Sequence, residues 1–449
     1  MSGSALKAER WGSSWTLVMV VSGSVIGFSN IWWLPVIAGQ NGAGAFWIAY
    51  LLGLLLVGVP LIIAELTIGA AGQADPVTAM GNLAVRSARG WVWSGVGWLT
   101  CLAGLLLAPL YVVVAGWAAA YMVMSGSGEF LGSDLDMAGE VFAAVFSGQH
   151  HVWYWSGAVL LLAMGISACG VNKGVGLSAR ILVPLGLALL VAIAYFSRHF
   201  GNVGATVEFM VTPDWAGLDW STLIMALTYG IFSLGIGTGV MIAMGNYVPY
   251  KQDIPVAALA IVLVEFSASV LAGYVILPMV FNQNIEITGG VALLFVAVPV
   301  SFGSVTYGGY LLSLLYVAVL IAAITSLIAL LEPSVAALQA RSKVSRPVAV
   351  LLVGSVIGLL SHLCLVALEY DGQWESGNWF YGLDALSRYL LPAVGLAVAI
   401  FVSWVVRSRV VRDEFEEMPG FIFTLWRYSL RFIALPALLI VWFLYVFVN

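Results

Sequence analysis

Long apolar stretches follow one another along almost the whole chain, separated only by short polar or Gly/Pro-rich segments. A helix of about 20 mainly apolar residues is long enough to cross the hydrocarbon core of a bilayer. The stretches are continuously apolar rather than alternating, which favours helices over barrel strands. The sequence therefore predicts an all-α membrane protein with eleven transmembrane helices, near residues 14 to 39, 43 to 71, 91 to 124, 153 to 170, 177 to 197, 217 to 247, 254 to 281, 305 to 340, 347 to 368, 380 to 406 and 423 to 447.

The composition excludes several other classes of protein. Hydrophobic residues make up 62% of the chain and charged residues only 9%, whereas soluble domains carry about 25% charged residues. The net charge of −5 comes without any basic block, which excludes nucleic-acid binding. Cys101, Cys169 and Cys364 lie far apart in apolar runs, so neither a disulfide framework nor a cysteine metal site is expected. The four histidines show no metal-binding spacing.

The basic residues indicate how the chain is oriented in the membrane. With a cytoplasmic N-terminus, all Lys and Arg except Arg198 and Arg388 fall on the inner side, as the positive-inside rule requires. We expect a multi-pass protein of the cell inner (plasma) membrane with its C-terminus outside. The first span is too long for a signal-peptide core and is expected to stay in the membrane. Residues 125 to 152 and 369 to 379 are predicted outer loops, and residues 286 to 303 a re-entrant hairpin lid.

Two spans are interrupted in their middles. The first contains the run Ser22-Gly23-Ser24-Val25-Ile26-Gly27-Phe28-Ser29-Asn30, and the sixth contains Gly235, Gly237 and Gly239. Each Gly costs about 1 kcal/mol relative to Ala in a helix, so both spans are expected to unwind. Unwound backbone at this depth is tolerated only where it is buried in protein or lines a cavity. The alternative is that the small residues serve tight helix packing.

The two interrupted spans lie five apart, which predicts two corresponding halves. A repeat of five helices must be inverted in the membrane, and broken helices at matching positions indicate a transporter's binding site. The predicted divisions are a cytoplasmic N-terminal segment (1–13), a first inverted repeat (14–198), a second inverted repeat (217–408) and an additional span (423–447).

Short motifs stand at both broken spans and around them. The first span carries Gly27-Phe28-Ser29-Asn30-Ile31-Trp32 and Leu34-Pro35, with Trp11 before it and Asn41-Gly42-Ala43-Gly44-Ala45-Phe46 after it. The others are Gly58-Val59-Pro60 with Glu65, Tyr111 with Trp117, Phe232-Ser233-Leu234 with Gly237 and Gly239, Tyr247, and Leu390-Leu391-Pro392 with Trp404. Together they resemble the neurotransmitter:sodium symporter family in its prokaryotic eleven-span branch, which has the LeuT fold. The resemblance covers nearly the whole chain and implies sodium-coupled symport by alternating access.

The resemblance implies two sodium sites. The second site would use the carbonyls of Gly23 and Ile26 with Ala322, Thr325 and Ser326, although a Thr-Ser pair in a helix can also simply bond back to the preceding turn. The first site would use Val25, Asn30 and Ser233, together with Glu265 where the family usually has Asn. A buried acid within a span is a functional candidate by default. As a carboxylate Glu265 would bind sodium, and as a carboxylic acid it would make the cycle proton-linked.

The residues that resemble chloride ligands give a mixed pattern. Tyr50, Ser233 and Ser269 fit, while the expected Gln appears as Tyr229. A carboxylate at Glu265 would repel chloride by roughly 4 kcal/mol at 4 Å with an effective dielectric constant of 20. We therefore predict that transport requires sodium, as one or two ions, but not chloride.

By resemblance, the substrate carboxylate would meet the free N–H groups near Gly27 and the Tyr111 hydroxyl. No Asp accompanies Val25 and Ile26, so amines without a carboxylate are not expected as substrates. The wall around the side chain would come from Val25, Leu107, Phe232, Gly235, Thr238 and Leu330, and an ω-amino acid or taurine-like compound stays open as a substrate. The complete predicted substrate set is Ser24, Val25, Gly27, Phe28, Ser29, Leu107, Tyr111, Phe232, Ser233, Gly235, Thr238, Ser326 and Leu330.

The gates depart from the family pattern. The usual outer Arg is Trp33, which leaves Asp384 without its ion-pair partner unless Arg388 substitutes. The usual inner Asp is Ala340, so the cytoplasmic latch is expected to rely on other contacts, such as Trp11 with Arg10.

The sequence as a whole predicts a symporter that imports a neutral amino acid or related small zwitterion, as a monomer or weak dimer in the lipid bilayer. Two alternatives stay open: a proton-linked transporter that uses Glu265, and a non-transporting amino-acid sensor. An intramembrane enzyme is not expected, because the spacing pairs neither Glu65 nor Glu265 with a His or Cys.

Overall fold

The computed structural model describes residues 10–27, 29–148, 151–215, 219–248, 253–285, 290–371, 379–415 and 418–447. Every regular element within these ranges is a helix. Eight stretches are long and apolar enough to cross a membrane, namely Gly44–Gly72, Trp91–Gly126, Val171–Phe200, Ile254–Asn282, Gly308–Ser342, Arg346–Leu368, Trp379–Val405 and Gly420–Leu444. The prediction of an all-α membrane protein is confirmed, whereas the count of eleven spans stays a prediction.

The first part of the chain folds as a series of helices joined by short turns. The α-helices are α1 (Ser14–Val25), α2 (Ser29–Gln40), α3 (Gly44–Gly53), α4 (Val59–Gly72), α5 (Pro76–Arg86), α6 (Ser94–Gly126), α7 (Leu135–Phe146), α8 (Val152–Ala168), α9 (Leu177–Phe200) and α10 (Val203–Val211). Tighter or wider turns join some of them, namely η1 (Leu54–Gly58), η2 (Trp91–Trp93) and η4 (Val171–Gly176).

The second part repeats this pattern of long helices and short turns. Its α-helices are α11 (Trp220–Ser233), α12 (Val240–Gly245), α13 (Ile254–Asn282), α14 (Val298–Gly303), α15 (Gly308–Ser342), α16 (Arg346–Asp371), α17 (Trp379–Ile400), α18 (Ser408–Val411), α19 (Gly420–Ser429) and α20 (Leu435–Phe447). The accompanying turns are η5 (Leu293–Ala297), η6 (Phe401–Val405), η7 (Arg412–Phe415) and η8 (Leu430–Ala434).

Both predicted interruptions are present. The first span is divided into α1, which ends at Val25, and α2, which begins at Ser29. The sixth span is divided into α11 and α12, and between them Gly235, Gly237 and Gly239 have φ angles of +62°, +88° and +75°. Residues with a Cβ rarely adopt this left-handed region, so the three glycines explain why the helix stops here. The segment also fits tightly, because a Cβ at Gly237 would lie 2.7 Å from the carbonyl oxygen of Leu391 in α17.

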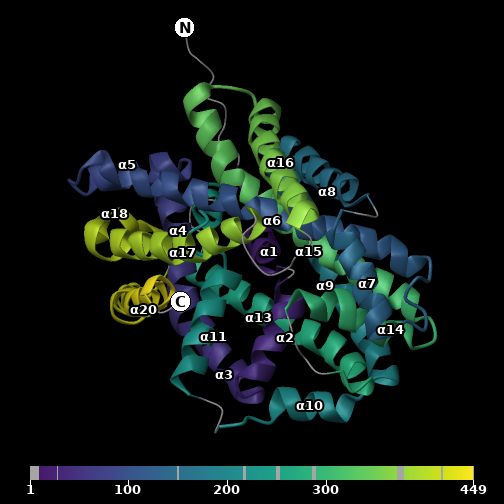
Figure 1. The fold of residues 1–449 in the computed structure, drawn as a ribbon. Helices are drawn as coiled ribbons and strands as arrows, with labels where there is room; N and C mark the ends of the chain where they lie inside the picture. The colour runs from purple at the N-terminus through teal and green to yellow at the C-terminus, as the bar shows by residue number, and fades with distance from the viewer. Residues whose placement is uncertain are drawn as a thin grey trace.

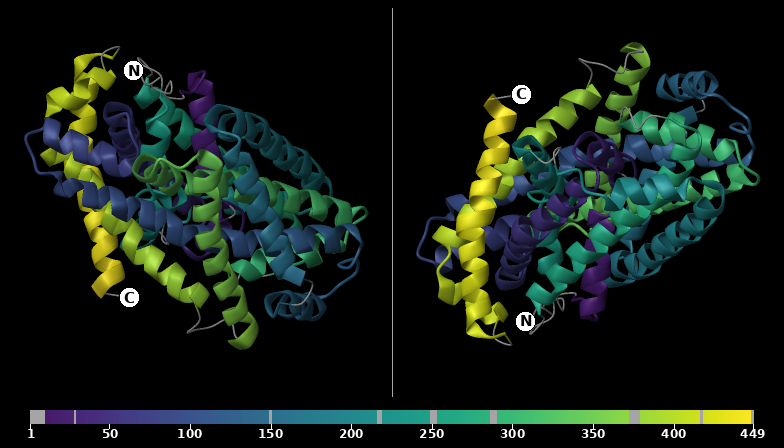
Figure 2. Two further views of the ribbon diagram at one scale, coloured as in Figure 1. Left: turned by 90° about the horizontal axis from the view of Figure 1, so that it is seen from above. Right: turned by 90° about the horizontal axis from the view of Figure 1, so that it is seen from below.

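The broken first span lies at the centre of the helical bundle (Figure 1). Helix α1 packs against α9, α13 and α15, and α15 in turn packs along α6. The C-terminal helix α20 lies at the edge of the bundle against α17 (Figure 2). The interrupted backbone is therefore buried in protein, as unwound backbone at membrane depth must be.

The predicted outer loop 125–152 contains a helix, which corrects that expectation in part. The side chain of Asp134 caps the start of α7 by accepting from the N–H of Met137 at 2.8 Å. Val145 and Phe146 of α7 are buried, so this acidic stretch is amphipathic rather than irregular. In the predicted lid, residues 290–303 form η5 and α14, which are buried against α7, α13 and α15, and residues 286–289 lie outside the described residues.

Candidate functional site

The break in the first span faces α15 directly. The Ser326 hydroxyl donates to the carbonyl oxygens of Gly23 at 3.3 Å and Ser24 at 3.4 Å. Gly23 lies so close to α15 that a Cβ there would be 3.1 Å from the Cβ of Thr325. The residues predicted for the second sodium site are thus brought together. The Thr325 hydroxyl donates to the carbonyls of Ile321 and Ala322, both at 3.0 Å, which is the helix back-bond that the sequence left as an alternative.

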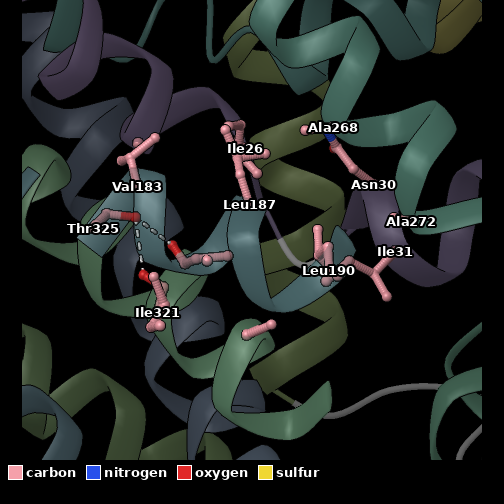
Figure 3. Close-up of a pocket in the computed structure, with 14 residues that line it drawn as sticks. Ile26, Asn30, Ile31, Val183, Leu187, Leu190, Ala268, Ala272, Ile321 and Thr325 are labelled. Carbon is pink, nitrogen blue, oxygen red and sulfur yellow. Dashed lines mark hydrogen bonds between the residues drawn. The ribbon is translucent and has the colours of Figure 1, made fainter. Parts of the chain in front are cut away.

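A cavity lies beside this site, between α1, α2, α9, α13 and α15 (Figure 3). Figure 3 shows Val183 and Thr325 on one side of the cavity and Asn30 and Ile31 on the other. Its other labelled residues are almost all apolar, including Ile26 and Leu187. The cavity therefore reaches residues of both predicted sodium sites.

One carboxylate oxygen collects the residues predicted for the first sodium site and for chloride. Oε1 of Glu265 accepts from the side-chain amide of Asn30 at 2.9 Å, from the Tyr50 hydroxyl at 2.5 Å, from the Ser269 hydroxyl at 3.3 Å, and from the Ser233 hydroxyl. All five side chains are buried. Oε2 is also buried and has no hydrogen-bond partner among the described residues, so it is available to a cation.

Tyr229, which stands where the resemblance expects a Gln, packs its ring against that of Tyr50. The ring centroids are 5.8 Å apart and the planes meet at 61°. Tyr229 thus belongs to the wall of the Glu265 cluster.

The predicted substrate residues lie on α1, α6, the α11–α12 break and α15. Val25, Thr238 and Leu330 are buried, and Leu107 and Tyr111 are half-buried. Tyr111 lies beside Ser326, which places the predicted carboxylate-binding hydroxyl near the residues of the second sodium site. Phe28 lies outside the described residues, as does the side chain of Ser29.

The break in the sixth span is held by a buried acid. Oε1 of Glu65 on α4 accepts from the N–H of Gly237 at 2.8 Å. On the other side, a Cβ at Gly104 of α6 would lie 2.8 Å from the carbonyl oxygen of Thr238. Glu65 therefore satisfies an N–H group that the unwound turn leaves without a helical partner.

The predicted outer gate residues lie in two separate contacts. Asp384 and Arg388 form an ion pair at 2.5 Å within α17, with side-chain exposures of 32% and 46%. The half-buried Trp33 lies against Gly290, where a Cβ would be 3.0 Å from the ring atom Cε3. An aromatic contact with the segment before η5 thus occupies the position of the family's usual outer Arg.

Near the N-terminus, Trp11 contacts the end of the predicted sixth span rather than Arg10. Its backbone N–H donates to the Tyr247 carbonyl at 2.7 Å, and its indole Nε1 donates to the Met244 carbonyl at 3.0 Å. The Arg10 guanidinium instead donates to the side chain of Gln73 at 3.2 Å.

A buried ion pair beside Trp11 was missed by the sequence analysis. Glu332 of α15, fully buried, accepts from both Nη atoms of Arg346 at 2.9 and 2.6 Å and from the Tyr247 hydroxyl at 2.7 Å. Arg346 also donates to the Ser167 carbonyl at 2.7 Å. Glu332 is the sole acid in the eighth predicted span, and that was the signal that could have identified it.

Comparisons with known proteins agree with this geometry. A model of the sodium:neurotransmitter symporter family matches residues 8–131 and 149–449. The chain is 28% identical over 442 residues to an uncharacterised sodium-dependent transporter, YhdH, of Bacillus subtilis, with 97% of both chains covered. It is 23% identical over 471 residues to the sodium- and chloride-dependent GABA transporter 2 of Homo sapiens, covering 93% of this chain and 76% of the relative. The crystal structure of MhsT in complex with L-phenylalanine superposes with a TM-score of 0.87 at 31% identity, covering 98% of this chain and 100% of the other.

Proposed function

Since this chain belongs to the sodium:neurotransmitter symporter family, we propose that it uses a sodium gradient to import a neutral amino acid or a related small zwitterion by alternating access. Sodium-coupled transport across a membrane is common to the family, and its relatives are transporters rather than enzymes. The substrate class, the number of ions and the orientation are the parts that we propose. We place the N-terminus in the cytoplasm and the C-terminus outside the plasma membrane, on the distribution of Lys and Arg.

The observation that carries the proposal is the convergence of oxygen atoms at the broken first span. Ser326 and Thr325 lie against Gly23, and unwound backbone supplies carbonyls without the cost of burying a full countercharge. Asn30 lies on the opposite side of the same cavity and donates to Glu265, and we propose that these two residues belong to the first site. We propose that each site holds one sodium ion.

The proposed substrate carries both a carboxylate and an amine. Tyr111 lies beside Ser326, where its hydroxyl can donate to a carboxylate, and the break contains no acidic side chain that would replace that carboxylate. The proposed wall around the substrate side chain includes Gly235 and Thr238, two small residues. MhsT was solved with L-phenylalanine, so an aromatic amino acid belongs among the first candidates beside the aliphatic ones.

A thermal-shift panel tests the proposal. Detergent-purified protein is screened against the twenty amino acids plus taurine, GABA and betaine, first in sodium and then in potassium. A ligand at a hundred times its Kd stabilises a folded protein by about 2.7 kcal/mol, so we expect at least one compound to raise the melting temperature in sodium only. Stabilisation that is equal in potassium would contradict sodium coupling. Binding without accumulation in proteoliposomes would instead support the sensor alternative.

We also expect uptake to be independent of chloride. Oε1 of Glu265 already sits among the donors Tyr50, Ser233 and Ser269, which occupy the positions where the resemblance expects chloride ligands. A second anion there would meet a repulsion of roughly 4 kcal/mol at 4 Å and an effective dielectric constant of 20. Replacing chloride with gluconate on both sides of proteoliposomes should leave the initial uptake rate unchanged. A loss of uptake in gluconate would show that chloride is a ligand after all.

The same four donors favour sodium coupling over the proton-linked alternative. Hydrogen bonds donated to a carboxylate stabilise its charged form. Asn30, Tyr50, Ser233 and Ser269 all donate to Oε1 of Glu265, whereas Oε2 has no partner among the described residues and can meet a cation. We therefore propose that Glu265 acts as an anion that binds sodium through Oε2.

A further inference from the structure

Two arginines of the C-terminal region meet at the end of the tenth span. Arg427 donates through Nη2 to the carbonyls of Ser403 at 3.1 Å and Val406 at 2.7 Å, and through Nη1 to the Ser408 hydroxyl at 2.8 Å. Arg431 donates to the same Ser403 carbonyl through Nε at 2.9 Å and Nη2 at 2.5 Å. Both guanidinium groups therefore cap the carbonyls that the last turn, η6, leaves without helical partners.

Within the described residues, no carboxylate balances the positive charge of this pair. Neither Arg427 nor Arg431 has a described carboxylate within 4.0 Å. The carbonyls at a helix C-terminus are equivalent to about half a negative charge, against two full positive charges. Arg427 is only 9% exposed, and its buried Nε has no hydrogen-bond partner among the described residues. In the part of the chain that the structure describes, the pair therefore has no counter-anion.

The surface around the pair is aromatic and exposed. The Arg431 guanidinium lies 4.7 Å above the ring centre of Trp404, which is 56% exposed. Tyr428 and Phe432, 56% and 62% exposed, stack on each other with their ring centroids 5.7 Å apart. Aromatic side chains of this kind gather at the level of lipid headgroups. The distribution of Lys and Arg puts this end of the protein in the inner leaflet, which is rich in anionic lipids.

We propose that this cluster, formed by Arg427, Arg431 and Trp404, binds the phosphate group of an anionic phospholipid. Arg431 provides the contact from the rim of the cluster, and the exposed Arg407 and Arg409 of the neighbouring turn add to the attraction. Inorganic phosphate has the same charged group, but the surrounding aromatic rings favour a ligand with acyl chains. The site lies on the tenth and eleventh spans, away from the predicted sodium and substrate residues, and does not depend on the proposed transport function.

Native mass spectrometry of the delipidated full-length protein tests the proposal. Phosphatidylglycerol and phosphatidylcholine are titrated in turn, and the lipid-bound fractions are measured. We expect phosphatidylglycerol to be preferred and its Kd to rise about fivefold in Arg431→Gln, since one Arg near an anionic surface contributes about that factor. Arg431→Lys keeps the charge and should stay within about twofold of the wild type. In all variants the affinity for phosphatidylcholine should be unchanged.

The matched control is Arg89→Gln, which removes an exposed arginine from another cytoplasmic turn. An equal loss of phosphatidylglycerol affinity in Arg89→Gln and Arg431→Gln would overturn the proposal, because it would mean diffuse attraction to the whole inner face. Competition of millimolar inorganic phosphate with phosphatidylglycerol would overturn the assignment to a lipid. A fall in the affinity for both lipids in Arg431→Gln would identify the residue as a structural cap only, and would also overturn the proposal.

Discussion

Sodium-dependent substrate binding is expected to be lost in Glu265→Gln. The substitution keeps the shape of the side chain but replaces the buried, unpartnered Oε2 with an amide nitrogen that faces the ion. Removing a full charge about 4 Å from sodium costs roughly 4 kcal/mol at an effective dielectric constant of 20. Because each 1.4 kcal/mol is a factor of ten, the sodium affinity should fall by about three orders of magnitude. Titration of sodium against the binding of a radiolabelled substrate measures this change.

The control for this variant is Glu208→Gln, which removes an exposed acid from α10 and leaves the net charge the same as in Glu265→Gln. It should bind sodium as the wild type does. If Glu265→Gln retained the sodium affinity of the wild type, the Glu265 carboxylate would not be a sodium ligand. The proton-linked alternative would then replace the proposal of sodium binding at Glu265. Size-exclusion chromatography of both variants establishes that the fold is intact.

The second large effect is expected on stability, in Glu332→Ala. This substitution leaves Arg346, whose side chain is only 12% exposed, without its carboxylate, and it removes the acceptor of the Tyr247 hydroxyl. Breaking one partner of a buried ion pair destabilises a protein by about 3 to 5 kcal/mol, because the remaining charge stays buried. Denaturant unfolding in detergent micelles, followed by tryptophan fluorescence, should show a lower free energy of unfolding by this amount.

Asp384→Ala provides the comparison, since it removes an ion pair of the same chemistry that is solvent-exposed. The Asp384–Arg388 pair is 32% and 46% exposed, and exposed pairs contribute at most about 1 kcal/mol. The loss of unfolding free energy should therefore be several-fold larger in Glu332→Ala than in Asp384→Ala. Equal costs would contradict the assignment of Glu332 and Arg346 as a buried, desolvated pair. Tyr247→Phe removes the hydroxyl alone and separates its hydrogen bond from the ion pair.

The sequence predicted the features that depend on local composition. Glycine destabilises a helix and adopts left-handed φ angles readily. Gly235, Gly237 and Gly239 lie within five residues and all have such angles, so the break follows from residue type. An acid in an apolar span must find partners, and Glu265 does so with the hydroxyl and amide side chains that the resemblance placed near it.

Features that depend on contacts between separate helices were not predictable in the same way. The partner of Glu332 is Arg346, at the start of the next helix, and a basic residue there was assigned to the cytoplasmic loop by its position alone. Helix α7 lies in a stretch that the sequence predicts as a loop because it is acidic and polar. Its buried residues, Ala138, Val145 and Phe146, lie on one face of the helix, and that pattern is the signal for it. Helices α1, α8 and α11 are apolar but have only 12, 17 and 14 residues, which is why eight of the described helices are long enough to cross a membrane whereas sequence windows predict eleven spans.

The position of the outer ion pair affects how the equilibrium between outward-facing and inward-facing states responds to the medium. Asp384 and Arg388 lie one turn apart on α17, so their attraction is the same whether the outer mouth is open or shut. An interaction that is equal in two states shifts no population between them. Salt weakens the attraction between exposed charges, but it would weaken this ion pair equally in both states. The contact of Trp33 with Gly290 joins two uncharged residues, so ionic strength does not alter it either.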